Sequence, residues 1–299
     1  MLFTFVLLLG PIITLTSSNW IICWVGLELT FLGLIPLMFM GKYFTFSKES
    51  ILKYFCIQSM SSALIFLSGI MMLYDCSSMF DVVFIFSICL KLGMFPGHFW
   101  VPSVISSVEW YSCLLLLTWQ KIPALAMFLI FMELSSKDVG IYILILGGLS
   151  SLVGGLIGNN INNIRAMVGA SSVSHTGWIV VGLKMSFMWG YFLIYSLVLI
   201  LGLGFLWSCH HLSSISILSM SGLPPFIMFI GKWGIVSGAL ANMINIKFLV
   251  LPVIGALLSL IFYLKFTYSF YLIEWEQRNM IIGSPLVFLN FLGVLYLIA

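Results

Sequence analysis

The sequence predicts an all-α polytopic membrane protein, and three observations support this fold class. Hydrophobic residues make up 62% of the 299 residues and charged residues only 7%, against roughly 25% charged in soluble domains. Windows of about twenty apolar residues recur along the chain, and short segments with turn residues or charge separate them. Such a chain has too little polar surface to cover a water-soluble globule. We therefore expect about eleven transmembrane helices.

The predicted spans begin with an amino-terminal apolar segment that lacks the basic flank and the small-residue cleavage site of a removable signal. Two later spans are too long for a single crossing, and we expect each to be interrupted. No soluble domain fits between the spans, so residues 1–299 are predicted to form one transmembrane domain. The spans are expected at residues 2–16, 20–40, 51–73, 80–106 (interrupted), 110–132, 139–157, 164–183, 188–208, 213–242 (interrupted), 247–270 and 283–298.

The two interrupted spans carry the same kind of break, a glycine followed within a few residues by proline. Paired interruptions in two parts of one chain indicate transporter repeats with discontinuous helices. A further proline, in span 110–132, removes one helical N–H and is expected to leave a backbone acceptor near Lys121 unpaired. The predicted helix-break residues are Gly93, Pro96, Pro123, Gly222, Pro224 and Pro225.

Four charged residues stand deep inside apolar spans, namely Glu28, Lys91, Lys121 and Lys232. Glu28 and Lys91 lie on the order of 15 Å from the polar end of their spans, close to the midplane of a bilayer about 30 Å thick. Neither side chain can reach the headgroups from there, so each charge needs a partner inside the bundle. Charges kept at this depth indicate a proton or ion path. A structural ion pair, or for Glu28 a helix–helix hydrogen bond, is the alternative interpretation.

Lysine and glutamate suit proton transfer. Burial disfavours the charged form of a lysine and a nearby carboxylate favours it. Lys91 can therefore hold or release a proton as Glu28 moves, and the proton is expected to pass through water to Lys121 and then towards Lys232. Arginine could not do this, because it does not deprotonate in proteins.

Two histidines are candidate relays: His98 follows the first break, and His175 lies in a serine-rich span. A hydrogen-bonded packing role fits them equally well. No catalytic, cofactor-binding or metal-binding residue is predicted, because no nucleotide motif, metal set or nucleophile–base pair stands out. The net charge is +3, and the sequence contains no run of basic residues. This argues against a nucleic-acid partner.

Six strings, in order along the chain, carry a family resemblance: SSNWIICWVGLELTFLGLIPLM, ESILKYFCIQSMSSALI, CLKLGMFPGHFWVP, LTWQKIPAL, IRAMVGASSVSHTGWIV and SGLPPFIMFIGKW. They resemble the subunit 2 family of animal mitochondrial NADH:ubiquinone oxidoreductase, respiratory complex I, whose members are similar to cation/proton antiporters. The chain departs from the family at Phe95-Pro96-Gly97, where Ala-Pro-Phe is more usual, and at Ile122-Pro123-Ala124, where Ile-Ala-Pro is more usual.

The resemblance implies an antiporter-like inverted-repeat bundle, multi-pass in the mitochondrial inner membrane, with other membrane-arm subunits, membrane lipids and protons as partners. It implies a non-redox subunit of the proton-translocating reductase that is not an enzyme by itself. NADH, flavin, iron–sulfur clusters and ubiquinone would be bound elsewhere in the complex. By this resemblance Glu28 corresponds to the family's acidic partner and Lys91 to the lysine paired with it. Lys121 corresponds to the central lysine, and Lys232 to the lysine of the second broken helix. His98 and His175 correspond to two histidines near the proton path.

The expected function is proton transfer across the membrane through a midplane Glu/Lys relay, coupled to quinone reduction elsewhere in the complex. Two other functions remain open. A stand-alone secondary cation/proton antiporter would have the same fold and buried lysines but would work as a single component. A purely structural membrane-arm scaffold would need the midplane lysines for assembly alone.

Overall fold

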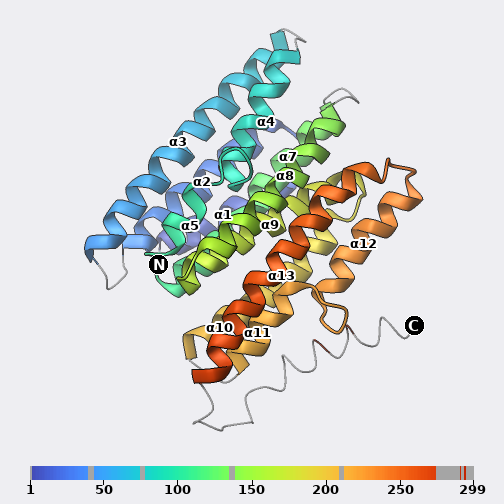
Figure 1. Ribbon diagram of the computed structural model, residues 1–299. Helices are drawn as coiled ribbons and strands as arrows, with labels where there is room; N and C mark the ends of the chain where they lie inside the picture. The colour runs from blue at the N-terminus through green and yellow to red at the C-terminus, as the bar shows by residue number, and fades with distance from the viewer. Residues whose placement is uncertain are drawn as a thin grey trace. The chain divides into compact units, whose positions relative to one another are not determined.

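The structure is a computed structural model that describes residues 2–39, 44–74, 78–134, 139–208 and 212–273, together with Asn290 and Gly293. The regular structure of these residues is helical throughout (Figure 1). The chain forms two compact units, unit 1 with residues 1–146 and unit 2 with residues 147–299, and each is described by itself. The assignment of residues 1–299 to one antiporter-like domain stays a prediction.

Unit 1 begins with a helical hairpin in which two backbones approach closely. A Cβ atom added to Gly10 would lie 2.7 Å from the carbonyl oxygen of Gly26, so small residues let the two helices meet at this point. Later helices of the unit pack on this hairpin and on each other. The helices are α1 (Leu2–Thr16), α2 (Trp20–Phe39), α3 (Phe44–Tyr74), α4 (Ser78–Leu92), α5 (Trp100–Ile105), α6 (Trp110–Leu117) and α7 (Lys121–Leu134).

Unit 2 is built around one enclosed helix, α9, in which every residue from Ala166 to Gly182 is buried. The other helices of the unit pack on it or on each other. The serine hydroxyls of α9 donate to carbonyls three residues earlier in the same helix, which satisfies them in an apolar setting. The helices of the unit are α8 (Val139–Asn160, of which unit 2 holds residues 147–160), α9 (Ile164–Lys184), α10 (Met188–Ser208), α11 (Leu212–Ser221), α12 (Met228–Ala241) and α13 (Lys247–Ile273).

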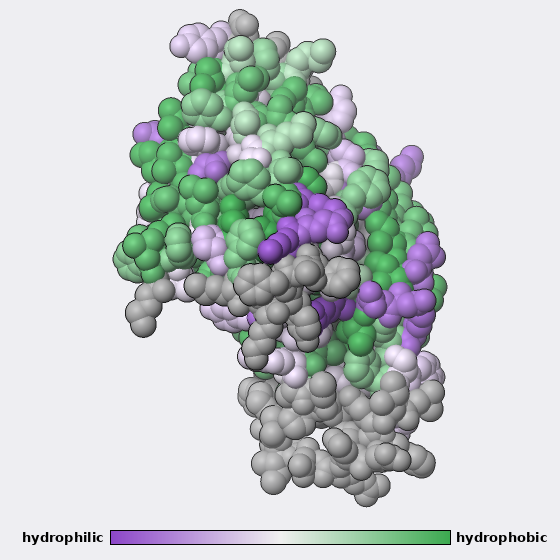
Figure 2. Space-filling model, turned by 90° about the vertical axis from the view of Figure 1, so that its left-hand side faces the viewer, coloured by the Kyte–Doolittle hydropathy of each residue, from purple (hydrophilic) through white to green (hydrophobic). Residues whose placement is uncertain are grey.

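The described helices have the length and composition of a membrane protein. Seven helical segments of the described residues are long and apolar enough to cross a bilayer, one of them formed by α6 and α7 together, and the face in Figure 2 is mostly hydrophobic. Large apolar side chains such as Leu257 and Ile261 are more than half exposed, as a lipid-facing surface requires. The predicted all-α membrane fold is thus confirmed.

The predicted spans up to residue 270 all fall on described helices. The largest difference is the start of α3, which begins at Phe44, seven residues before the predicted span. Glu49 and Lys53 lie 2.6 Å apart as an i,i+4 pair, and such pairs support helix in polar sequence that a hydropathy window leaves out. Of the predicted span 283–298, only Asn290 and Gly293 are described, both as helix; the rest lies outside the described residues.

The two predicted interruptions lie between α4 and α5 and between α11 and α12. The residue directly after α4 is Gly93, with φ +69°, and the residue directly after α11 is Gly222, with φ +74°. This left-handed conformation strains any residue with a side chain, so glycine ends both half-helices. Pro96 lies in the first segment, and Pro224 and Pro225 in the second.

A third interruption lies at residues 118–120, between α6 and α7, and corrects the expectation for Pro123. The proline does not break the helix but lies in the first turn of α7, where a missing N–H is tolerated. A backbone acceptor near Lys121 was expected to be unpaired; the carbonyl of Trp119, four residues before Pro123, accepts from the N–H of Ile122 at 3.3 Å.

Candidate proton-transfer site

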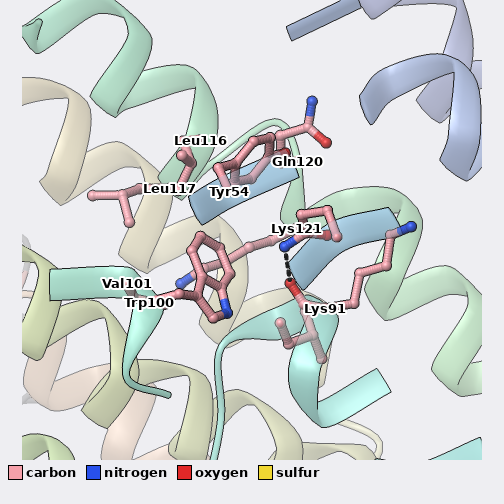
Figure 3. A pocket seen from close by; sticks show the side chains of 10 residues that line it. Tyr54, Lys91, Trp100, Val101, Leu116, Leu117, Gln120 and Lys121 are labelled. Atoms are coloured by element: carbon pink, nitrogen blue, oxygen red, sulfur yellow. Dashed lines mark hydrogen bonds between the residues drawn. The ribbon is translucent and has the colours of Figure 1, made fainter. Parts of the chain in front are cut away.

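The break after α4 is closed by neutral donor side chains from neighbouring elements of unit 1. The indole N–H of Trp100 donates to the carbonyl of Leu90 at 2.9 Å. The side-chain amide of Gln58, on α3, donates to the carbonyl of Lys91 at 3.2 Å, which is the dashed line in Figure 3. Carbonyls at the end of a helix lack partners within it. Because Gln58 and Trp100 supply these partners, the ammonium group of Lys91 is not needed as a cap.

Lys91 instead faces Glu28 of α2 in a loose ion pair. The Nζ–Oε1 distance is 3.9 Å, which is too long for a charged hydrogen bond. The side chain of Lys91 is 5% exposed and that of Glu28 is 21% exposed. Among the described residues, neither of these two atoms has a hydrogen-bond partner. The two groups therefore lie near each other inside the unit without a hydrogen bond between them, and the ammonium of Lys91 also lies 5.8 Å from the centroid of the Phe31 ring.

Lys121 shares a small pocket with Lys91. The pocket measures about 20 Å³ and is lined mainly by side chains of α3, the α4–α5 region and the α6–α7 turn; this volume suffices for roughly one water molecule. In Figure 3 the two lysine side chains extend in different directions, so that Lys91 points away from Lys121. Both are almost fully buried. The polar and aromatic lining residues are Tyr54, Gln58, Lys91, Trp100, Gln120 and Lys121.

The turn before Lys121 is fixed by the amino-terminal hairpin. The indole N–H of Trp119 donates to the carbonyl of Leu7 at 2.9 Å. The side-chain amide of Gln120 donates to the carbonyl of Thr30 at 2.6 Å. These two bonds tie residues 118–120 to α1 and α2, and they set the point at which α7, and with it Lys121, begins.

Lys232 of unit 2 has a different environment. Its Nζ donates to the carbonyl of Ser221, the last residue of α11, at 2.7 Å. The same Nζ lies 6.0 Å from the centroid of the Trp178 ring. A cation at a helix C-terminus is stabilised by the helix dipole and by the unpaired carbonyls there. Lys232 thus caps the half-helix that ends at Gly222.

The two histidines are both buried and both hydrogen-bonded. Nδ1 of His98 lies 3.1 Å from the carbonyl oxygen of Pro96; because a carbonyl only accepts, Nδ1 carries the proton and donates. His175 bonds through both ring nitrogens, with Nδ1 2.9 Å from the hydroxyl of Tyr191 and Nε2 3.2 Å from that of Tyr263.

The structure therefore brings Glu28, Lys91 and Lys121 together in unit 1, and Lys232 and His175 lie in unit 2. Sequence reasoning missed Gln58, whose signal was an amide in the middle of an apolar span. It also missed the tyrosines beside His175, which nothing in their local sequence distinguishes from packing aromatics.

The sequence of this chain matches a known protein family. A family model described as NADH:quinone oxidoreductase/Mrp antiporter, TM, matches residues 17–209. The chain is 36% identical over 269 residues to NADH-ubiquinone oxidoreductase chain 2 of Albinaria caerulea, covering 89% of this chain and 87% of the relative. It is 31% identical over 305 residues to the chain of the same name from Anopheles gambiae, covering 93% and 87%.

Solved structures share the fold at lower sequence identity. A chain of respiratory complex I from Thermus thermophilus superposes with a TM-score of 0.78 at 21% identity, covering 99% of this chain and 76% of that one. A chain of the Mrp complex from Dietzia sp. DQ12-45-1b gives a TM-score of 0.74 at 16% identity, covering 88% and 59%. Both likenesses support an antiporter-like helical fold.

Proposed function

The chain belongs to the NADH-ubiquinone oxidoreductase chain 2 family, and from this premise we propose that it carries protons across the inner mitochondrial membrane through Glu28 and the buried lysines. Quinone reduction elsewhere in complex I drives this transfer. The chain itself holds no redox centre and acts as a non-redox subunit among other membrane-arm subunits, with lipid around it.

The loose pair of Glu28 and Lys91 is the observation that carries the proposal. Two unit charges 4 Å apart attract by about 4 kcal/mol at an effective dielectric constant of 20. That energy corresponds to about three powers of ten in a protonation equilibrium. Because no hydrogen bond between the described residues locks the pair at 3.9 Å, a small displacement of the carboxylate changes how firmly Lys91 holds its proton.

Lys121 is the next acceptor. It lies with Lys91 around a pocket that can hold a water molecule, and the two ammonium groups point apart. Transfer of a proton from Lys91 to Lys121 therefore requires a chain of water longer than the single molecule that this pocket holds. Lys232, held on the carbonyl of Ser221, receives the proton later in the path.

The test is to replace Lys121 with arginine and with methionine in the assembled complex, and to measure protons translocated per NADH oxidised in sealed vesicles. Arginine keeps the charge but does not release a proton. We expect both variants to assemble and both to pump poorly. Lys53→Met is the control, since Lys53 is half exposed near the start of a span, and it should pump normally.

Parental pumping by Lys121→Arg would show that a fixed charge suffices and would overturn the relay. If the Lys121 variants reduced the amount of assembled complex, but the complex that did form pumped normally, the purely structural scaffold would be favoured. A native gel separates the remaining alternative: the subunit runs in a complex far larger than the chain, whereas a stand-alone antiporter runs as a small oligomer.

A further inference from the structure

Unit 2 contains a buried polar cluster that the lysine path does not use. His175 of α9, Tyr191 of α10 and Tyr263 of α13 are 3%, 0% and 0% exposed. Tyr191 and Tyr263 bond to the two opposite nitrogens of the imidazole. Three helices therefore contribute one continuous chain of hydrogen bonds, from phenol through imidazole to phenol.

Stability alone does not explain this cluster. Burying two phenol hydroxyls and an imidazole costs desolvation, which their mutual hydrogen bonds roughly offset. Apolar side chains of the same shape would pack at similar or lower free energy, because replacing both partners of a buried hydrogen bond is often nearly neutral. What the polar version adds is a set of exchangeable protons in the middle of the most enclosed helix.

The chemistry of the chain permits one proton to pass without leaving a charge behind. A neutral imidazole donates from one nitrogen and accepts at the other, and each phenol does both. When a proton arrives at the Tyr191 oxygen, the hydroxyl proton moves to Nδ1. The Nε2 proton moves to the Tyr263 oxygen, and the original Tyr263 proton leaves. One proton enters and one leaves, and the imidazole changes tautomer.

One end of this chain lies beside the lysine of the second broken helix. Gly231, the residue before Lys232, packs on the ring of Tyr191: an added Cβ would lie 2.9 Å from its Cδ2. Trp178 stacks on Tyr191 with a centroid distance of 6.5 Å and also lies under the ammonium of Lys232. The other end, Tyr263, belongs to α13. The cluster thus leads from the surroundings of Lys232 to another helix of unit 2.

We propose that Tyr191 and Tyr263 are proton-carrying residues of this protein, which pass protons through His175 between the surroundings of Lys232 and helix α13. The proposal rests on the proposed function, since it extends the same proton path. It assigns a role to two residues that the lysine and glutamate set leaves out.

The experiment uses Tyr191→Phe, Tyr263→Phe and the double variant in the assembled complex. Each change keeps the ring and removes one hydroxyl. We expect each single variant to lower the rate of proton translocation about tenfold or more, since a positioned proton-transfer group is worth at least that much. The double variant should be no slower than the slower single variant, because the two hydroxyls act in series. Losses that multiply in the double variant would indicate two independent packing effects and overturn the proposal.

Tyr195→Phe is the matched control. Tyr195 lies one turn after Tyr191, and its ring lies 5.1 Å from that of His175, centroid to centroid. We expect it to pump at the parental rate, and a loss equal to that of Tyr191→Phe would contradict the assignment. If a tyrosine variant fails to assemble, His175→Gln replaces it: the amide keeps one donor and one acceptor but cannot relay. Parental pumping by His175→Gln would also overturn the proposal.

Lys121→Met, measured in parallel, separates the two proposals. If Lys121→Met pumps poorly while the tyrosine variants pump normally, only the role of the tyrosines is wrong. If Lys121→Met pumps normally, the proposed function is wrong.

Discussion

The two broken helices of this protein end in the same way but use their lysines differently. Both half-helices stop at a left-handed glycine, Gly93 in unit 1 and Gly222 in unit 2. In unit 2 the lysine itself closes the break, with Nζ 2.7 Å from the carbonyl of Ser221. In unit 1 neutral side chains close it, and Lys91 faces a carboxylate 3.9 Å away.

The difference shows how one local motif gives two chemical results. A lysine that donates to a backbone carbonyl meets a fixed partner whose charge never changes. A lysine opposite a glutamate meets a partner that can move and can itself take up a proton. Residues on other helices, above all Gln58 of α3, decide which case applies, because they determine whether the lysine is needed as a cap.

The largest effect expected is on stability when one half of the ion pair is removed. Lys91→Met leaves the carboxylate of Glu28 facing an apolar surrounding, and breaking a buried pair from one side costs about 3 kcal/mol. Adding Glu28→Gln should recover most of that loss. The same second change should not rescue Lys232→Met, whose partner is the carbonyl of Ser221. Thermal unfolding of the assembled complex measures all four variants; equal rescue of both lysine variants would remove the distinction between the units.

The next effect tests whether Gly222 keeps room for Lys232. A Cβ at this position would lie 2.6 Å from Nζ of Lys232, and its φ of +74° strains an L residue. We expect Gly222→Ala to cost roughly 1–3 kcal/mol of stability and to displace the lysine, which lowers proton translocation. Gly204→Ala is the control because an added Cβ there meets no atom of the described residues within 4 Å. Equal thermal stability of the two variants would refute the close fit.

The smallest effect concerns the amide that leaves Lys91 available. Gln58→Leu removes the donor to the carbonyl of Lys91, and an unpaired buried acceptor costs about 1–2 kcal/mol. The neighbouring change Ser59→Ala removes only a bond to the preceding turn of its own helix and should be close to neutral. Hydrogen exchange of the amides around Gly93 should increase in Gln58→Leu alone. Unchanged exchange there would mean that the break does not depend on Gln58.

Composition and hydropathy were enough to predict the fold class and most helix boundaries, because the bilayer requires long apolar helices. They also located the breaks at Gly93 and Gly222, since only glycine and proline interrupt helices so regularly. The break near Lys121 was misplaced by a few residues. A proline in the first turn of a helix has the same sequence signal as a proline that breaks one.

The candidate site could be predicted only where charge marked it. Charge and depth showed that Glu28 and Lys91 each need a partner, the family resemblance implied that they pair with each other, and their side chains lie 3.9 Å apart. Gln58 and Tyr263 were missed, since an uncharged polar residue in a membrane span costs much less free energy than a charged one and its partner depends on packing between distant helices. The capping role of Lys232 could not be predicted either, because its partner is a backbone carbonyl, which every residue type has.

The most direct measurement compares two Glu–Lys pairs of the same chain. Glu28 lies opposite Lys91 inside unit 1, whereas Glu49 and Lys53 lie 2.6 Å apart with both side chains more than half exposed. Protons translocated per NADH are measured in vesicles that hold the fully assembled complex with Glu28→Gln or with Glu49→Gln. We expect Glu28→Gln to lower the ratio and Glu49→Gln to leave it unchanged. A parental ratio in a fully assembled Glu28→Gln complex would contradict the claim that the buried pair moves protons.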